Sequence, residues 1–168
     1  MKISLHAFSV QIYTNTLGHL SGILEKGLAH ATARKFEPAV LVNARLAPDM
    51  LPLARQVQIA CDMAKNSASR LAGLEPPRFE DTEQTFEELL ARVARTIDYL
   101  KGVPASALEG AEDRDIKVPA RERTLQFKGL EFLQRFALPN FFFHVTTAYD
   151  ILRHNGVELG KRDFTGGF

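Results

Sequence analysis

The stretch that decides the fold is Leu138-Pro139-Asn140-Phe141-Phe142-Phe143-His144-Val145-Thr146-Thr147-Ala148-Tyr149-Asp150-Ile151-Leu152-Arg153-His154-Asn155-Gly156. Its residues recur at helical spacing, and one continuous stripe comprises Ala137, Phe141, His144, Ala148 and Ile151. Asn140 and His144 lie one turn apart on the same side of this helix. A polar pair that faces a hydrophobic interior costs free energy unless it is hydrogen-bonded or bound to a ligand. The pair therefore marks a candidate site.

Three roles are open for His144: a metal ligand, a general base, or a structural group that is hydrogen-bonded to a neighbour. Asn140 could be that neighbour, or it could bond the backbone carbonyl freed by Pro139. Because Pro139 removes one backbone hydrogen bond, we expect a kink immediately before the pair.

An earlier helix supplies three further candidates for the same site. Gln56 and Gln58 flank its apolar stripe, and Asp62 lies further round on the side of Gln58. Any of the three could point to His144 across a bundle, although solvent is the commoner environment for such side chains. The candidate ligand pocket thus comprises Asn140, His144, Gln56, Gln58 and Asp62.

Length and composition indicate one ordinary globular domain that spans residues 1–168. The 21 basic and 20 acidic residues give no electrostatic reason to expect a nucleic acid or an anionic membrane as partner. Cys61 is the only cysteine, which excludes an intramolecular disulfide and a multi-cysteine zinc site, and its place on an apolar stripe predicts burial. No apolar run reaches about 18 residues and no signal peptide is evident, so we expect a cytoplasmic protein.

Four helices are predicted from the apolar periodicity and the capping signals. They cover residues 5–34, 49–71, 81–100 and 129–155. We expect Asp49 to cap the second helix and Asp81 with Gln84 to form a capping box at the third. Gly73 and Gly156 fit positions just past the second and fourth helices.

The segments between the helices follow different patterns. Residues 36–49 read as a connection with a short turn near 39–41, and residues 157–168 as an irregular tail. Alternating polar and apolar residues predict strands at 115–119 and 123–127 around a turn at 120–122. The fold class is therefore all-α: a four-helix bundle with a small β-hairpin between the third and fourth helices.

Recognised catalytic motifs are absent from the sequence. No two histidines form a His-x-x-x-His pair, and there is no nucleophile elbow, phosphate-binding glycine loop or dinucleotide fingerprint. Composition and periodicity by themselves name no reaction.

Several long motifs resemble an uncharacterised bacterial family, a domain of unknown function grouped with the DinB/YfiT-like proteins. They are the runs 43–50, 70–73 with 79–81, 136–149 and 152–157. The resemblance covers nearly the whole chain. It implies a DinB-like four-helix bundle, usually a homodimer, with a helix order unlike that of a simple up-down bundle.

The wider superfamily is described as putative metalloenzymes, and it includes thiol-dependent transferases and isomerases. The resemblance implies a divalent metal held by three histidines: one from the second helix, and two from a His-x-x-x-His before a Leu-Arg-x-x-Gly ending. Here that ending is Leu152 to Gly156, so His144 and Asn140 fall at the two ligand positions of the last helix. The second helix has no histidine; Gln56, Gln58 or Asp62 would have to substitute.

Because two of the three expected histidines are absent, two functions remain open. The first is a DinB-like binding or stress-related homodimer, with a degenerate metal site and room for a small-molecule ligand. The second is a DinB-like enzyme of thiol-transferase or hydrolase type, dependent on a base or on zinc or nickel, that uses a pocket at His144. Asn offers a neutral oxygen, whereas zinc and nickel favour imidazole, so any metal would be held loosely.

Overall fold

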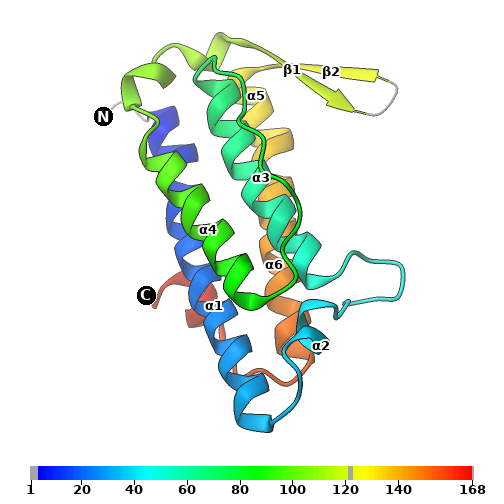
Figure 1. Cartoon of the computed structure of the whole chain (residues 1–168). Coiled ribbons are helices and arrows are strands. Elements are labelled where there is room, and N and C mark those ends of the chain that lie inside the picture. Colours follow the sequence, from blue (N-terminus) through cyan, green and yellow to red (C-terminus); the bar gives the residue numbers. More distant parts are fainter. Residues whose placement is uncertain (1–3, 121–122, 168) are drawn as a thin grey trace.

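The computed structural model describes residues 4–120 and 123–167 and shows a four-helix bundle with a small hairpin at one end (Figure 1). The bundle helices are α1 (Ile12–Arg34), α3 (Leu53–Leu71), α4 (Phe86–Lys101) and α6 (Leu138–His154). A π-helical segment, η1 (Ala7–Gln11), leads into α1. The predicted all-α class with a β-hairpin between the third and fourth bundle helices is confirmed.

The order of the helices around the bundle differs from their order along the chain. α3 packs between α4 and α6, and α1 packs mainly on α4, so α1 and α3 do not face each other as in a simple up-down bundle. Figure 1 shows that α3 and α4 run in the same direction. The connection between them must therefore return along the bundle. We call this connection, residues 72–85, the strap.

The core lies on the inward faces of the four helices. Its largest fully buried side chains include Tyr13, Phe86, Phe132 and Phe141. Tyr13 meets Phe141 edge to face, with ring centroids 4.8 Å apart. Cys61 is buried as predicted, and burial raises the pKa of its thiol to about 12, so the thiol is unreactive near neutral pH.

Two helix starts lie further along the chain than the sequence predicted. α3 begins at Leu53 after Pro52, because residues 43–52 form a loop in which the Leu53 amide bonds the Ala44 carbonyl. α4 begins at Phe86, where Thr85 and Glu88 form the capping box. The predicted cap at Asp81 is wrong because that carboxylate pairs with two arginines instead.

The predicted helix ends are confirmed. Gly73 and Gly156 follow α3 and α6 with φ values of +72° and +89°, a conformation that glycine adopts without the strain other residues incur. The short turn near residue 40 is the helix α2 (Ala39–Val42).

The hairpin consists of β1 (Asp115–Ala120) and β2 (Arg123–Lys128), which pair antiparallel from Asp115 with Lys128 to Ala120 with Arg123. It is preceded by the short 3-10 helices η2 (Ala105–Leu108) and η3 (Ala111–Asp113). Ile116 and Val118 are buried, so the hairpin packs on the helices as expected. Residues 121 and 122 of the predicted turn lie outside the described residues.

The last predicted helix is one helical run with a change of winding in the middle. α5 (Gly129–Phe132) passes into the π-helical segment η4 (Leu133–Ala137) and then into α6. The π-helical turn directly precedes Pro139, which has no amide hydrogen to donate. Where we expected a kink, the structure thus shows an interruption of the regular hydrogen-bond ladder.

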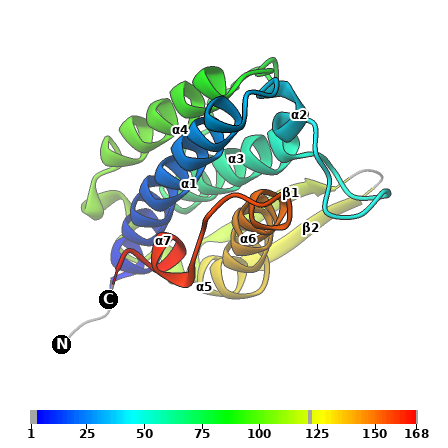
Figure 2. The ribbon, with the colours of Figure 1, turned by 90° about the horizontal axis from the view of Figure 1, so that it is seen from below.

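The prediction of an irregular tail is wrong. Val157 and Leu159 are buried, and α7 (Lys161–Thr165) follows them and lies against α1, as Figure 2 shows. Lys26 pairs with Asp163 at 2.7 Å, and His19 Nδ1 lies 3.0 Å from the Phe164 carbonyl oxygen. Two apolar residues among glycines were enough to anchor this segment. No helix among the described residues has the length and apolarity needed to cross a membrane.

The capping box gives a test of the α4 boundary. Thr85→Ala removes the side chain that accepts the Glu88 amide, and should lower the free energy of unfolding by about 1 kcal/mol. Thr82→Ala, a few residues earlier in the exposed strap, should change it by less than about 0.5 kcal/mol. Urea denaturation measures both, and equal effects would contradict this helix start.

Candidate functional site: a histidine and an amide between α3 and α6

The site forms where α3 packs against α6. Gln56, on α3, is 1% exposed, and His144, on α6, is partly exposed. The Nδ1 atom of His144 lies 2.7 Å from Oε1 of Gln56. The structure thus brings His144 together with one of the three second-helix candidates.

A backbone carbonyl fixes which way the Gln56 amide points. Its Nε2 donates to the carbonyl oxygen of Leu51 at 3.0 Å, and that oxygen can only accept. Oε1 of Gln56 therefore faces the ring and accepts a hydrogen bond from His144 Nδ1–H. In a neutral imidazole with the proton on Nδ1, Nε2 carries a lone pair. No described residue is hydrogen-bonded to that Nε2.

Burial favours the neutral form of the His144 ring. Burial lowers the pKa of His144 below its ordinary value, because the charged form loses solvation. The folded chain then binds this proton less readily than the unfolded chain. The contribution of the neutral His144 ring to the free energy of unfolding is full above the ordinary pKa. It is lost as the pH falls through the lowered pKa.

Asn140 is not the partner of His144. Its Nδ2 donates to the carbonyl oxygen of Phe136 at 2.6 Å, one turn earlier in the same helical run. In a regular helix Pro139 would face the carbonyl of Arg135, so the bonded carbonyl is next to the one that the proline leaves free. The Nδ2 atom of Asn140 is therefore satisfied within its own helix, and its Oδ1 atom can only accept.

Gln58 and Asp62 face the opposite side of α3, so the idea that either reaches His144 is wrong. Gln58 Oε1 accepts from Arg55 at 2.6 Å, and its Nε2 donates to Glu83 at 2.9 Å. Asp62 pairs with Arg92 at 3.0 Å. Residues 56 and 58 are two apart on a helix, which places their side chains on different sides.

A zinc or nickel ion does not fit these residues. His144 is the one imidazole at the site, and the other two positions carry neutral amides that are already bonded within the chain. These metals favour imidazole and thiolate. Among the described residues, no group of three or more His, Cys, Asp or Glu side chains could hold a metal ion.

A second polar cluster, between α3, α4 and the strap, was not predicted. Its centre is Arg92, with a side chain 1% exposed, which bonds Glu83 at 3.1 Å and Asp81 at 2.9 Å in addition to Asp62. The sequence held a signal: Arg92 falls at helical spacing between Leu89 and Thr96, both of which are buried. A charged residue on a buried helix face needs paired partners.

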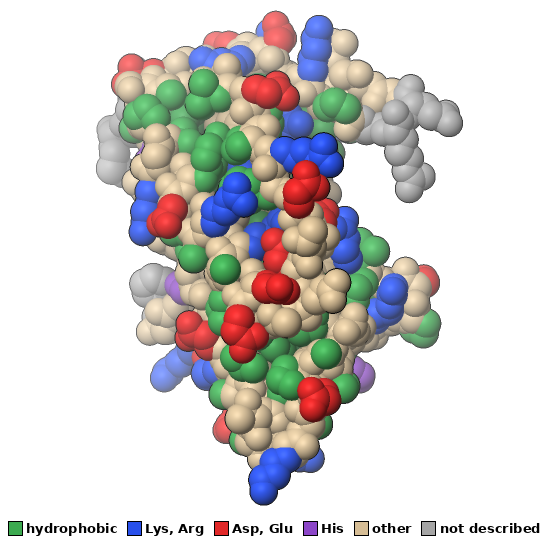
Figure 3. Space-filling view, viewed as in Figure 1, with side chains coloured by type: hydrophobic (Ala, Val, Ile, Leu, Met, Phe, Trp, Pro, Cys, Tyr) green, Lys and Arg blue, Asp and Glu red, His purple; other side chains and the backbone are tan. Residues whose placement is uncertain are grey.

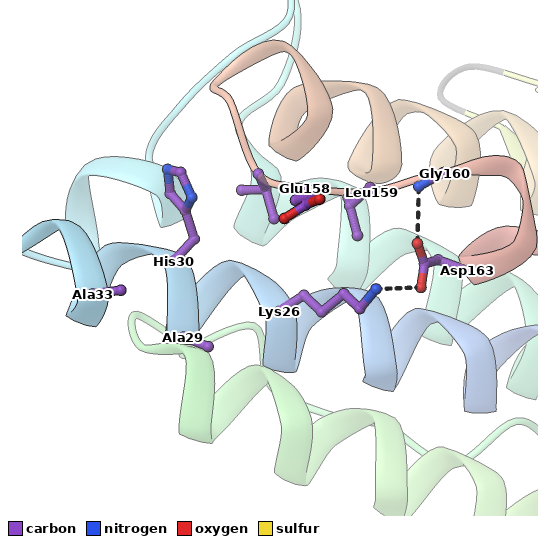
Figure 4. A pocket seen from close by; sticks show the side chains of 9 residues that line it. Lys26, Ala29, His30, Ala33, Glu158, Leu159, Gly160 and Asp163 are labelled. Carbon is purple, nitrogen blue, oxygen red and sulfur yellow. Dashed lines mark hydrogen bonds and ion pairs between the residues drawn. The ribbon is translucent and has the colours of Figure 1, made fainter.

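Five hollows on the described surface lie elsewhere. The one with the greatest volume of these five, about 640 Å³, is a trough between α1 and the segment that leads into α7. Figure 4 shows Lys26 reaching across it to Asp163, which also accepts the Gly160 amide at 2.8 Å. His144 lines none of the five.

Comparison with known proteins identifies the family. A family model described as "Domain of unknown function (DUF1993)" matches residues 5–165. The chain belongs to this family. A crystal structure of a DinB family member protein from Shewanella denitrificans resembles it with a TM-score of 0.90 and 41% sequence identity, over 98% of this chain and 93% of that one. No curated protein matches the chain.

The comparisons confirm the predicted family and the DinB-like bundle. DUF1993 is a domain of unknown function, so the residues of this chain are what indicate its chemistry. They provide a neutral imidazole oriented by a buried amide.

Proposed function

We propose that this DUF1993 protein is a cytoplasmic, non-catalytic, DinB-like binding or stress-related protein, in which the superfamily's metal position has become a neutral hydrogen-bonding site. The observation that carries the proposal is the chain of bonds from the Leu51 carbonyl through Gln56 to His144. In this chain of bonds, Gln56 on the second bundle helix orients the imidazole of His144. A position that supplies a metal ligand in the superfamily would thus hold a residue that supports His144 instead.

The chemistry of the site indicates what it would bind. The lone pair on His144 Nε2 accepts a hydrogen bond, so the ligand must offer a hydroxyl, amine or amide donor. Apolar surface lies alongside: Phe143 is 56% exposed, with its ring centroid 5.2 Å from that of His144. The side chain of Leu51, whose carbonyl begins the chain of bonds, is also exposed. A small molecule with one donor and an apolar body suits this surface.

A second candidate is an enzyme that uses His144 as a general base. The observation in its favour is the same unpartnered, unprotonated Nε2 on a ring held by Gln56, which is how a base is positioned. Such an enzyme, of thiol-transferase or hydrolase type, requires no metal. The two candidates differ in whether a bound thiol or ester is turned over.

Rebuilding the histidine set tests whether this is the altered metal position. The double variant Gln56→His/Asn140→His places imidazoles at the two positions nearest His144, and three histidines are a good zinc site. Elemental analysis of untagged protein incubated with zinc or nickel should find about one equivalent in the variant. The wild-type chain should bind less than about a tenth of an equivalent.

The matched control is Gln58→His/Asn140→His. It adds the same two imidazoles, but residue 58 faces the strap rather than α6, so the control should bind no more metal than the wild type. Near-stoichiometric metal in the wild type would contradict the proposal. Equal metal binding by the two double variants would contradict the placement of the site.

A homodimer is part of the proposal, and the exposed face of α1 supports it. Gly18 and Gly22 lie inside this helix, where each glycine costs about 1 kcal/mol relative to alanine. A Cβ atom at either position would meet nothing within 4 Å, so packing within the chain does not require them. The small residues Gly18, Gly22, Ala29 and Ala33 lie symmetrically about Glu25 and Lys26. In an antiparallel two-fold pairing, small residues would meet small residues.

Sedimentation tests the dimer and its interface together. The wild-type chain should sediment at twice its mass of 18.7 kDa at micromolar concentration. Gly22→Leu should shift the mass toward the monomer because the added side chain keeps the helices apart. Ala94→Leu, at an exposed site on α4, should leave the dimer intact. A wild-type monomer would contradict the dimer, and a dimeric Gly22→Leu would contradict this interface.

A further inference from the structure

The strap is held against the bundle but contributes little to the core, with Ala72 alone among its apolar residues packed against it. None of residues 72–85 is fully buried, whereas Gln58, Lys65 and Arg92, which bond to them, are. Figure 1 shows the strap returning along α3 and α4, and it forms neither helix nor strand. A hollow of about 250 Å³, lined in part by Phe79, lies at the seam between strap and α4. Hydrophobic burial is therefore not what fixes this segment.

Charge complementarity holds it instead. The helices supply cations: Arg55 and Arg92 pair with Asp81 at 2.5 and 2.9 Å, and Arg92 also pairs with Glu83. Phe79 lies between two more cations, with Arg95 at 3.8 Å and Lys65 at 4.6 Å from the ring centroid. Figure 3 shows acidic and basic side chains gathered along the middle of this face, where the strap runs.

The contacts follow the alternation of an extended chain. Phe79, Asp81 and Glu83 face the helices, while the side chain of Glu80 faces away and pairs only with Arg78 among the described residues. The backbone takes part as well: Lys65 donates to the Pro77 carbonyl, and Arg92 donates to the Glu80 carbonyl at 2.9 Å. The strap thus occupies the groove as a bound peptide would, with alternate side chains recognised and two carbonyls held.

The groove would be unbalanced without an acidic occupant. Four cations, Arg55, Lys65, Arg92 and Arg95, then remain, and Asp62 is the helix carboxylate that forms ion pairs with any of them among the described residues. Removing one partner of a buried ion pair costs far more than the pair contributes, so the strap leaves only if similar charges replace it. The strap's anchors are partly exposed, with Asp81 at 34% and Glu83 at 14%, so exchange in solvent is feasible.

We propose that the groove between α3 and α4 is a recognition site for an extended acidic peptide of the pattern Phe-x-Asp-x-Glu, and that the strap is its resident occupant in cis. The partner is a segment of another protein with this chemistry, which displaces residues 77–83. This site is independent of the one at His144. In the absence of the partner the strap keeps the buried cations paired.

The test weakens the resident segment and offers the same sequence in trans. The probe is a fluorescein-labelled peptide of residues 76–84, and its anisotropy is followed with the full-length protein. Asp81→Asn/Glu83→Gln removes two charges that face the groove, and should bind the peptide at least tenfold more tightly than the wild type, because the open fraction rises. Binding should weaken as salt is added.

Two controls keep the result interpretable. Glu75→Gln/Glu80→Gln removes the same charge from strap residues whose carboxylates form no ion pair with the cations of the groove, and should bind like the wild type. A peptide carrying D81N and E83Q should lose its affinity for the strap variant, and a change in the peptide cannot unfold the protein. Circular dichroism verifies that both protein variants keep their helices.

Three outcomes would overturn the proposal. The folded strap variant could show no anisotropy change at millimolar peptide. It could bind the D81N/E83Q peptide as tightly as the unmodified peptide, which would mean that the acidic side chains are not recognised. It could sediment at a higher mass than the wild type without binding peptide, which would mean that the strap exchanges between copies of this chain.

Discussion

Burial of polar groups on both sides of α3 is the constraint on which the rest of the structure depends. This helix lies between α4 and α6, so side chains that would be solvated at the edge of a bundle are enclosed. Gln56 and Gln58 are 1% and 2% exposed. Pairing such groups matters because an unpaired buried polar atom costs about 1–3 kcal/mol. The two polar clusters described above pair the buried glutamines, one toward each neighbouring helix.

These clusters also shape the connections. Toward α6, the amide of Gln56 needs an acceptor and finds the Leu51 carbonyl, which ties the loop before α3 to the site. Toward α4, Lys65 and Arg92 need carboxylates and carbonyls, and the strap brings them. Because α3 and α4 run in the same direction, the chain has to return past these cations in any case. The segment that has to connect α3 to α4 thus also supplies the partners that the buried cations need.

Much of the fold could be predicted from the sequence because apolar periodicity and glycine after a helix are local signals. The bundle, the hairpin and the ends of α3 and α6 follow from them. The start of α4 was misplaced because Asp81 and Thr85 both head plausible capping boxes, and only tertiary contacts show that Asp81 serves arginines. The tail was misjudged because two buried residues, Val157 and Leu159, outweigh its glycines.

The candidate site could be predicted only in part. The periodicity and the family resemblance pointed to His144 and to the side of the last helix on which Asn140 and His144 lie. They could not choose among Gln56, Gln58 and Asp62, since that choice depends on which helices flank α3. The place of Arg92 on a buried helix face could be read from the spacing, but its partners could not, since Asp81 and Glu83 lie in the strap. Sequence pattern thus locates polar residues, and packing assigns their partners.

The protonation state of His144 tests the central claim most directly. Nitrogen-15 NMR of the labelled imidazole reports which ring nitrogen carries the proton and at what pH the ring becomes charged. The structure predicts a neutral ring at pH 7 with the proton on Nδ1, and a titration midpoint below the ordinary value of about 6.5. A ring protonated on Nε2 instead, or charged at pH 7, would contradict the account of a neutral acceptor oriented by Gln56.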